Sequence, residues 1–184
     1  SDVSIEGAVR LCAALAAAEH GDARRALDLL RVAGELAERE GKSLISEEHV
    51  RQAERRIEHD RVSEALKHLP AHSKLVICCA YLLNEANAQQ SITGDIYEVY
   101  RELCAQCGMA PLTQRRVSGL INELDALGLL NTRVISMGRY GRTKKIGLGI
   151  APDLVRDVFT NDNRMEHLIN YVPTCIAKAS SKKS

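Results

Sequence analysis

The chain has 184 residues, enough to bury one substantial hydrophobic core or two small ones. Its 25 basic and 24 acidic side chains leave a formal net charge of +1, so the overall charge gives no sign of a strongly charged partner. Six cysteines are present, but the adjacent pair Cys78 and Cys79 suits reduced core residues better than a disulfide framework. The longest apolar stretch near the start, residues 11–18, is too short to span a bilayer, and we expect no membrane partner.

Charge is distributed unevenly along the chain. Residues 1–60 contain 9 basic and 13 acidic side chains, a balance of −4, whereas residues 61–184 contain 16 and 11, a balance of +5. Such an asymmetry between the two halves indicates two domains with different partners.

The first part of the chain follows a helical pattern with two interruptions. The pattern predicts helices at about residues 3–18, 22–40 and 46–69. Asp22 is placed to cap the second helix and Gly41 to end it, while Ser46 is placed to cap the third. We therefore expect a three-helix bundle over residues 1–58, followed by a helical connection over residues 59–69.

The middle of the chain continues as two helices separated by a short strand. Ser73 opens an apolar helix that includes residues 75–83, and the β-tolerant residues 91–93 are compatible with a strand. Thr93 is placed to cap a further helix over residues 95–107, which a glycine and a proline end.

Residues 113–127 predict an amphipathic helix. Thr113 is a suitable N-cap, and Gly128 is a suitable stop. One apolar stripe at helical spacing is expected to be buried: Val117, Leu120, Ile121, Leu124 and Leu127.

A basic hairpin is predicted directly after this helix. Two β-prone runs, residues 133–137 and 144–150, flank Gly138 and Gly141, where a tight turn needs positive φ. Between residues 113 and 145 there are seven basic and two acidic side chains, so the positive charge is concentrated on the helix and the hairpin.

The predicted element order is helix, short strand, helix, helix, strand, wing, strand, helix, with Pro152 at the first turn of the last helix. This order is the winged-helix topology, which we place at residues 70–160, so the fold class is mainly α with one α+β domain. A helix followed by a cationic ribbon indicates DNA binding, with the helix in the major groove and the ribbon on the flanking backbone. The candidate DNA-binding residues are Thr113, Gln114, Arg115, Arg116, Ser118, Asn122, Arg133, Gly138, Arg139, Tyr140, Gly141, Arg142 and Lys144. Residues 161–184 form a C-terminal extension whose basic tail we expect to be disordered.

No catalytic or metal site is predicted. Cys104 and Cys107 form a single C-x-x-C pair without a second pair or a well-spaced histidine. His68 and His72 are four residues apart, but Pro70 breaks the helix that would align them.

The segment from Gly21 to Leu27 combines a glycine break, an aspartate cap and arginines in the first helical turn. Basic side chains are disfavoured there because the helix N-terminus already carries partial positive charge, so the arrangement indicates a nearby anion such as phosphate. GDARRALDLLRVAGELAER resembles the sensor-2 helix in the lid domain of AAA+ ATPases. It is most similar to the archaeal replication initiators related to the origin recognition complex and the cell-division-control loader protein. TQRRVSGLINELDALGLL and SMGRYGRTKKIGL resemble the recognition helix and wing of the same family.

This resemblance implies that the chain is the C-terminal part of a replication initiator and helicase loader, consisting of the lid and the winged-helix domain. It implies that Arg24 contacts ATP phosphates, with Arg25 the less suitable candidate because it points about 100° around the helix. The implied partners are double-stranded DNA at replication origins and a replicative helicase of the MCM type, in the cytoplasm with the nucleoid or in a nucleus. The chain has no G-x-x-x-x-G-K-[ST] loop, so any ATPase activity, with ATP or ADP and magnesium, is expected only of the full-length protein.

Two other functions are compatible with parts of the sequence. A winged-helix transcription regulator with a helical dimerisation element would explain the hairpin but not the segment at residues 21–27. A lid and collar module of another AAA+ protein, contacting protein alone, would explain that segment but not the basic hairpin.

Overall fold

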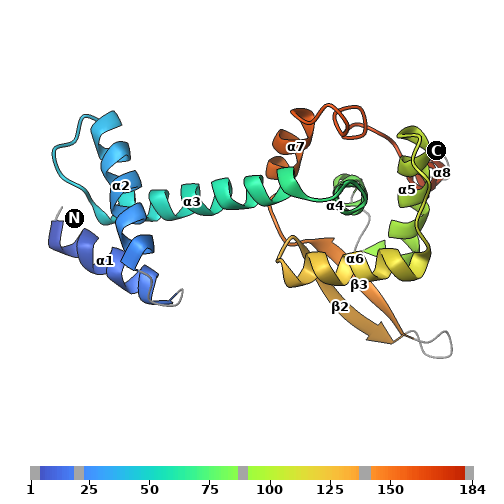
Figure 1. Ribbon diagram of the computed structural model, residues 1–184, viewed down its shortest axis with the longest axis horizontal. Coiled ribbons are helices and arrows are strands. Elements are labelled where there is room, and N and C mark those ends of the chain that lie inside the picture. The colour runs from blue at the N-terminus through green and yellow to red at the C-terminus, as the bar shows by residue number, and fades with distance from the viewer. Residues whose placement is uncertain (1–4, 19–22, 87–90, 137–141, 181–184) are drawn as a thin grey trace. The chain divides into compact units, whose positions relative to one another are not determined.

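The computed structural model describes residues 5–18, 23–86, 91–136 and 142–180 (Figure 1). The chain divides into two compact units, Ser1–Val62 and Ser63–Ser184. The finer boundaries expected at residues 58 and 70 remain a prediction. None of the helices in the described ranges is long and apolar enough to cross a bilayer.

The first unit is built from α1 (Ile5–Ala18), α2 (Ala23–Arg39) and the first part of α3 (Glu47–His68), as predicted. Small and branched side chains form its core: Ala8, Cys12, Leu29, Val32, Ala33, Val50 and Ala53. Gly41 ends α2 with a φ of 68°, in agreement with its predicted role. Ser46 caps α3, because its Oγ accepts a hydrogen bond from the His49 amide at 3.3 Å.

The second unit contains the remaining elements, and all but the last of them, a short helix that the sequence did not predict, occur in the predicted order. They are α4 (Ala71–Glu85), β1 (Ser91–Ile92), α5 (Thr93–Gln106), α6 (Gln114–Ala126), β2 (Leu130–Ser136), β3 (Arg142–Leu148), α7 (Pro152–Thr160) and α8 (Thr174–Ser180). The strands form one antiparallel sheet in the order β1-β3-β2. The predicted mainly helical class, with helices followed by a small α+β unit in the winged-helix element order, is confirmed.

Helix α4 is the centre of this second unit. Every residue from Leu75 to Leu83 is buried, because α4 contacts α5, α6, α7 and β3 at once (Figure 1). An all-round apolar helix of this kind has no solvent face and acts as the scaffold for the elements around it.

Several local predictions differ from the structure, among them the position of β3, which spans Arg142–Leu148 rather than residues 144–150. Helix α4 begins at Ala71 rather than at Ser73, and β2 begins at Leu130, three residues earlier than expected. Thr93 is the first residue of α5 rather than its cap. The Asp95 carboxylate satisfies this helix start, because it accepts a hydrogen bond from the Ile92 amide at 2.8 Å.

The segment after α7 also packs against the winged helix. Met165, Leu168 and Ile169 are buried, and the Glu102 carboxylate accepts hydrogen bonds from the Tyr171 hydroxyl at 2.9 Å and the Thr174 amide at 3.0 Å. This part of the predicted extension therefore belongs to the core of the second unit, whereas residues 181–184 of the expected basic tail lie outside the described residues.

Candidate nucleic-acid interface

Helix α6 has one buried face and one polar face. The Thr113 hydroxyl caps the helix by accepting a hydrogen bond from the Arg116 amide at 3.4 Å, as predicted. The buried face packs against α4, α5 and β2 and consists of Val117, Leu120, Ile121 and Leu124. At about 100° per residue, Arg115, Gly119 and Asn122 lie on the opposite side of the helix.

Leu127 was expected in the buried stripe, and this prediction is wrong. The helix ends at Ala126, and the Leu127 side chain is 64% exposed. Gly128 then reverses the chain with a φ of 72°, which turns Leu129 and Leu130 into the core instead, each 2% exposed.

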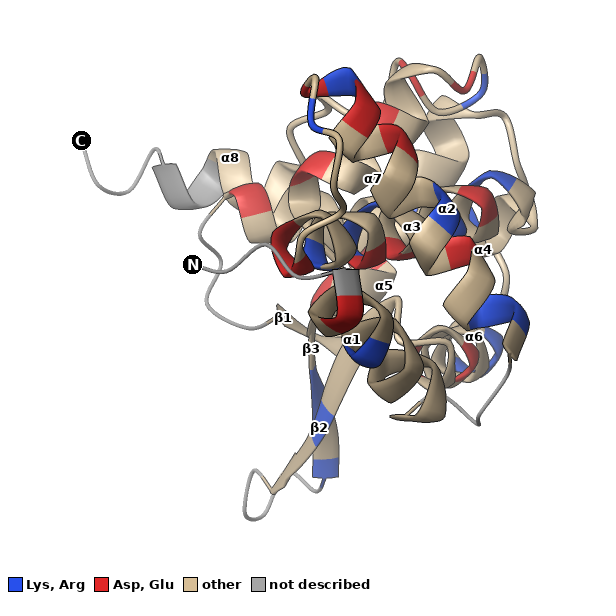
Figure 2. Ribbon diagram, turned by 90° about the vertical axis from the view of Figure 1, so that its left-hand side faces the viewer, with Lys and Arg blue, Asp and Glu red and all other residues tan. Residues whose placement is uncertain are grey.

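Basic residues lie along both strands of the hairpin that β2 and β3 form (Figure 2). Directly opposite residues of an antiparallel pair share a face, and neighbours along a strand alternate between faces. The pairs Val134–Lys144 and Ser136–Arg142 therefore lie on the face that also carries buried Ile146, next to the helices. The pair of Arg133 with Lys145 lies on the other face.

A groove of about 410 Å³ separates α6 from the hairpin. Its walls contain five of the predicted DNA-binding residues, Gln114, Ser118 and Asn122 from α6 with Arg142 and Lys144 from β3. Lys144 Nζ donates a hydrogen bond to Asn122 Oδ1 at 2.5 Å across the groove. None of the described lining residues is acidic, so the groove is electropositive and suits a polyanion.

The other predicted residues are distributed around the groove. Arg115 is exposed on the outward side of α6, and Arg116 Nη1 lies 3.2 Å from Glu123 Oε1. Arg133 is exposed on the far face of the hairpin rather than beside Arg142. The wing-tip residues Gly138, Arg139, Tyr140 and Gly141 lie outside the described residues.

The sequence did not identify every residue of this surface. Thr93, Val134 and Thr143 also line the groove. Lys145 shares a hairpin face with Arg133, and the alternation of side chains along a strand could have placed it there once the pairing register was known. No sequence signal marked Thr93 as a groove residue.

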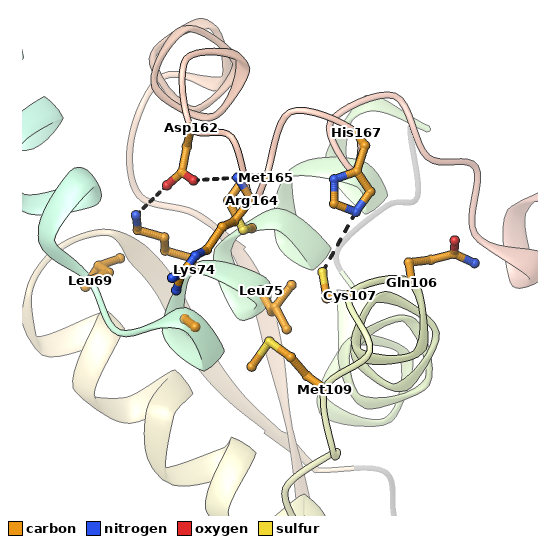
Figure 3. Close-up of a pocket in the computed structure, with 11 residues that line it drawn as sticks. Leu69, Lys74, Leu75, Gln106, Cys107, Met109, Asp162, Arg164, Met165 and His167 are labelled. Carbon is orange, nitrogen blue, oxygen red and sulfur yellow. Dashed lines mark hydrogen bonds and ion pairs between the residues drawn. The ribbon is translucent and has the colours of Figure 1, made fainter.

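A second cavity, of about 470 Å³, lies elsewhere in the same unit and contains none of the predicted site residues (Figure 3). Lys74 Nζ and Asp162 Oδ2 form an ion pair at 2.5 Å on its wall. Burial opposes ionisation of Asp162, but the hydrogen bonds from Lys74 and from the Arg164 amide outweigh it, so the pKa of Asp162 is lowered.

Cys107 Sγ lies 4.0 Å from His167 Nε2 in this cavity (Figure 3). Burial, followed by the neighbouring Cys104, raises the pKa of the Cys107 thiol, which disfavours the thiolate that a nucleophile or metal ligand requires. Within the described ranges no three His, Cys, Asp or Glu side chains are grouped as metal ligands.

Arg24 lies in the first unit, in the first turn of α2. Its side chain is exposed, and the first turn of α2 carries no acidic residue that would repel an anion. Residues 19–22, which include the glycine break and the predicted Asp22 cap, lie outside the described residues.

Comparison with known proteins assigns both halves of the chain. Residues 1–55 match the family profile described as the Cdc6 AAA+ ATPase-type lid domain. Residues 64–158 match the profile described as CDC6, C terminal winged helix domain.

Curated relatives point to the same family. The ORC1-type DNA replication protein of Thermococcus onnurineus is 54% identical over 164 residues, which cover 89% of this chain and 40% of the relative. The protein of the same description from Pyrococcus abyssi is also 54% identical over 164 residues, or 39% of its length. The chain thus spans about two fifths of the length of these relatives.

A solved structure shares both the fold and the sequence. The structure of the Aeropyrum pernix ORC1 protein in complex with DNA is 49% identical, with a TM-score of 0.78, over 88% of this chain and 42% of that one. The resemblance inferred from the sequence is confirmed, because the winged-helix profile alone matches more than half of the chain. The chain belongs to the ORC1/Cdc6 family, of which it contains the lid and the C-terminal winged helix.

Proposed function

We propose that this chain is the DNA-binding part of a replication initiator that recognises origins and loads a replicative helicase. The observation that carries the proposal is the electropositive groove between α6 and the hairpin, which brings together Gln114, Ser118, Asn122, Arg142 and Lys144. The relative of known structure that is 49% identical was solved in complex with DNA, which supports the same use of this surface.

The geometry suggests how the duplex would bind. An α-helix fits the major groove of B-DNA, and a two-stranded ribbon on one side of it reaches the adjacent minor groove. One sugar-phosphate strand then passes between the helix and the ribbon, through the groove that Arg142 and Lys144 line. Phosphate contacts there supply affinity, whereas residues on the outward side of α6 supply any base discrimination.

The lid is assigned a nucleotide role only within the longer protein. Arg24 suits a phosphate contact, since it lies at a helix N-terminus whose partial positive charge already favours an anion. The described residues offer no phosphate-binding loop, so ATP or ADP with magnesium would be held mainly by the AAA+ ATPase core of the full-length protein. Helicase loading is likewise a property of the whole protein, and we assign no residue of this chain to it.

A salt titration of duplex binding tests the DNA proposal. For Arg142→Ala we expect weaker binding and a plot of log affinity against log salt that is shallower by about 0.9 for each phosphate that the arginine neutralises. Arg101→Ala, an exposed arginine on α5 away from the groove, is the matched control and should bind as the wild type does. An Arg142→Ala protein with unchanged affinity and unchanged slope would show that the hairpin does not touch DNA.

A further inference from the structure

Gly119 occupies the outward side of α6, where the proposed DNA contact is made. The residues three and four positions away, which surround it on the helix surface, are Arg115, Arg116, Asn122 and Glu123. All four have polar side chains, and two of them, Arg116 and Glu123, form an ion pair that passes along the helix surface at Gly119.

Two common structural reasons for a glycine, a positive φ and a lack of space for a Cβ atom, do not apply at this position. Glycine is less favourable than alanine in a helix interior, because it loses more backbone freedom on folding. Among the described glycines only Gly41, Gly108 and Gly128 have positive φ, so Gly119 does not serve a left-handed conformation. A Cβ atom at Gly119 would meet a single heavy atom within 4 Å, Arg116 Nη1 at 3.7 Å, which is an ordinary contact.

We propose that Gly119 is the point at which α6 approaches the base pairs most closely, and that its missing side chain admits a base-pair edge in the major groove. This inference rests on the proposed function. A glycine lets another molecule come close to the helix backbone, whereas any side chain would hold it away. The missing side chain would thus favour duplex binding, although a glycine lowers the stability of the helix itself.

The position of Gly119 favours a base edge over a phosphate. With α6 in the DNA major groove and the hairpin in the minor groove, one sugar-phosphate strand lies between them. This strand would follow the protein groove that Ser118 and Lys144 line. Gly119 follows Ser118 and lies about 100° further around the helix, on the side opposite the buried stripe. That side is the one directed at the floor of the major groove when the helix enters it.

The test compares Gly119→Ala with a matched control, Gly34→Ala. Gly34 lies inside α2, and a Cβ atom there would also meet one heavy atom, Ile45 Cδ1, at the same 3.7 Å. The probe is a labelled duplex of the sequence that the wild-type chain selects from a random pool. Duplex affinity and the midpoint of thermal unfolding are measured for the three proteins.

Both variants should unfold a few degrees higher than the wild type, about 2–6 °C, because alanine replaces glycine within a helix. Only Gly119→Ala should bind the duplex more weakly, by about tenfold, the size of the discrimination that one base interaction supplies. This opposite movement of stability and affinity is not expected of a residue with a purely structural role.

Three other results would overturn the inference. Gly119→Ala that is more stable and binds as tightly as the wild type would show that no base approaches this position. Gly119→Ala that is less stable than the wild type would show that the fold itself requires the glycine. A wild-type chain that binds no duplex would remove the proposed function, and the role of Gly119 with it.

Discussion

Arg116 and Glu123 form an ion pair along the surface of α6, with 3.2 Å between Nη1 and Oε1. Their side chains are 59% and 58% exposed, so the pair contributes little to the stability of the fold. In the absence of DNA, however, Glu123 pairs with the guanidinium of Arg116, which the sequence predicts to contact DNA. We therefore expect Glu123→Gln to raise duplex affinity by about twofold to fivefold, the range that corresponds to a surface ion pair.

Removal of any acidic charge strengthens binding to a polyanion, so this prediction needs a second comparison. Glu98→Gln, an exposed glutamate on α5, makes the same charge change away from α6 and reports the general effect. The gain from Glu123→Gln should exceed that of Glu98→Gln, and it should shrink when Arg116 is already alanine. Equal gains in the presence and absence of Arg116 would show that the ion pair does not restrain this arginine.

Five of the nine residues that line the groove are among the predicted DNA-binding residues, but the sequence did not predict how they are arranged. The roles of Thr113 and Gly128 and the buried stripe apart from Leu127 could be predicted, because caps, positive φ and helical periodicity act locally. The orientation of Arg133 away from Arg142 could not be predicted, because it depends on the register of β2 against β3. A shift of that register by one residue would place Arg133 on the other face. The hydrogen bond between Lys144 and Asn122 likewise exists only after the hairpin has packed beside α6.

The ion pair between Lys74 and Asp162 joins α4 to the segment that follows α7. These side chains are only 14% and 20% exposed, so the pair is partly protected from solvent screening. Because the pKa of Asp162 is lowered in the folded state, its contribution to stability is present above the unfolded value, about 3.9. The contribution is lost as the pH falls through the folded pKa.

Asp162→Asn should therefore lower the free energy of unfolding at neutral pH by about 1.5–3 kcal/mol, the range for hydrogen bonds to a charged group. The difference between wild type and variant should be constant above about pH 5 and should shrink below about pH 4. Urea denaturation at a series of pH values measures it, and Asp157→Asn on the exposed side of α7 controls for the loss of a charge. A difference that persists undiminished at pH 3 would mean that the carboxylate is not stabilised by Lys74.

The sequence predicted the helices and strands of the second unit correctly where the signals are local. The predictions were wrong where tertiary packing determines the boundary of an element. Pro152 begins α7 as predicted, because its fixed φ suits the first helical turn. The start of β2 was predicted too late. Leu129 and Leu130 are buried in the core by tertiary contacts, which the sequence of the basic run after them does not indicate. Thr93 was assigned as a cap because its hydroxyl is suited to that role, whereas the Asp95 carboxylate fulfils it in the structure.

The two units divide the proposed work of the molecule between nucleotide and DNA. Ser1–Val62 carries Arg24, and Ser63–Ser184 carries the α6 groove. Because these functional residues belong to separate compact units, a substitution in one unit should leave the function of the other intact. The polarised charge of the chain, −4 over residues 1–60 and +5 over residues 61–184, agrees with this division.

Arg24→Ala in the full-length protein tests the division directly. A guanidinium that contacts a phosphate makes a charge-assisted hydrogen bond of about 1.5–3 kcal/mol, so its loss should weaken ATP binding or turnover by about tenfold to 150-fold. Arg25→Ala is the matched control, since the same charge is removed about 100° further around α2. Duplex affinity should be the same in both variants and in the wild type, because neither residue belongs to the second unit. ATP binding and turnover that are normal in Arg24→Ala, or equally reduced in both variants, would remove the sensor role from Arg24 and leave the lid without a nucleotide contact assigned to it.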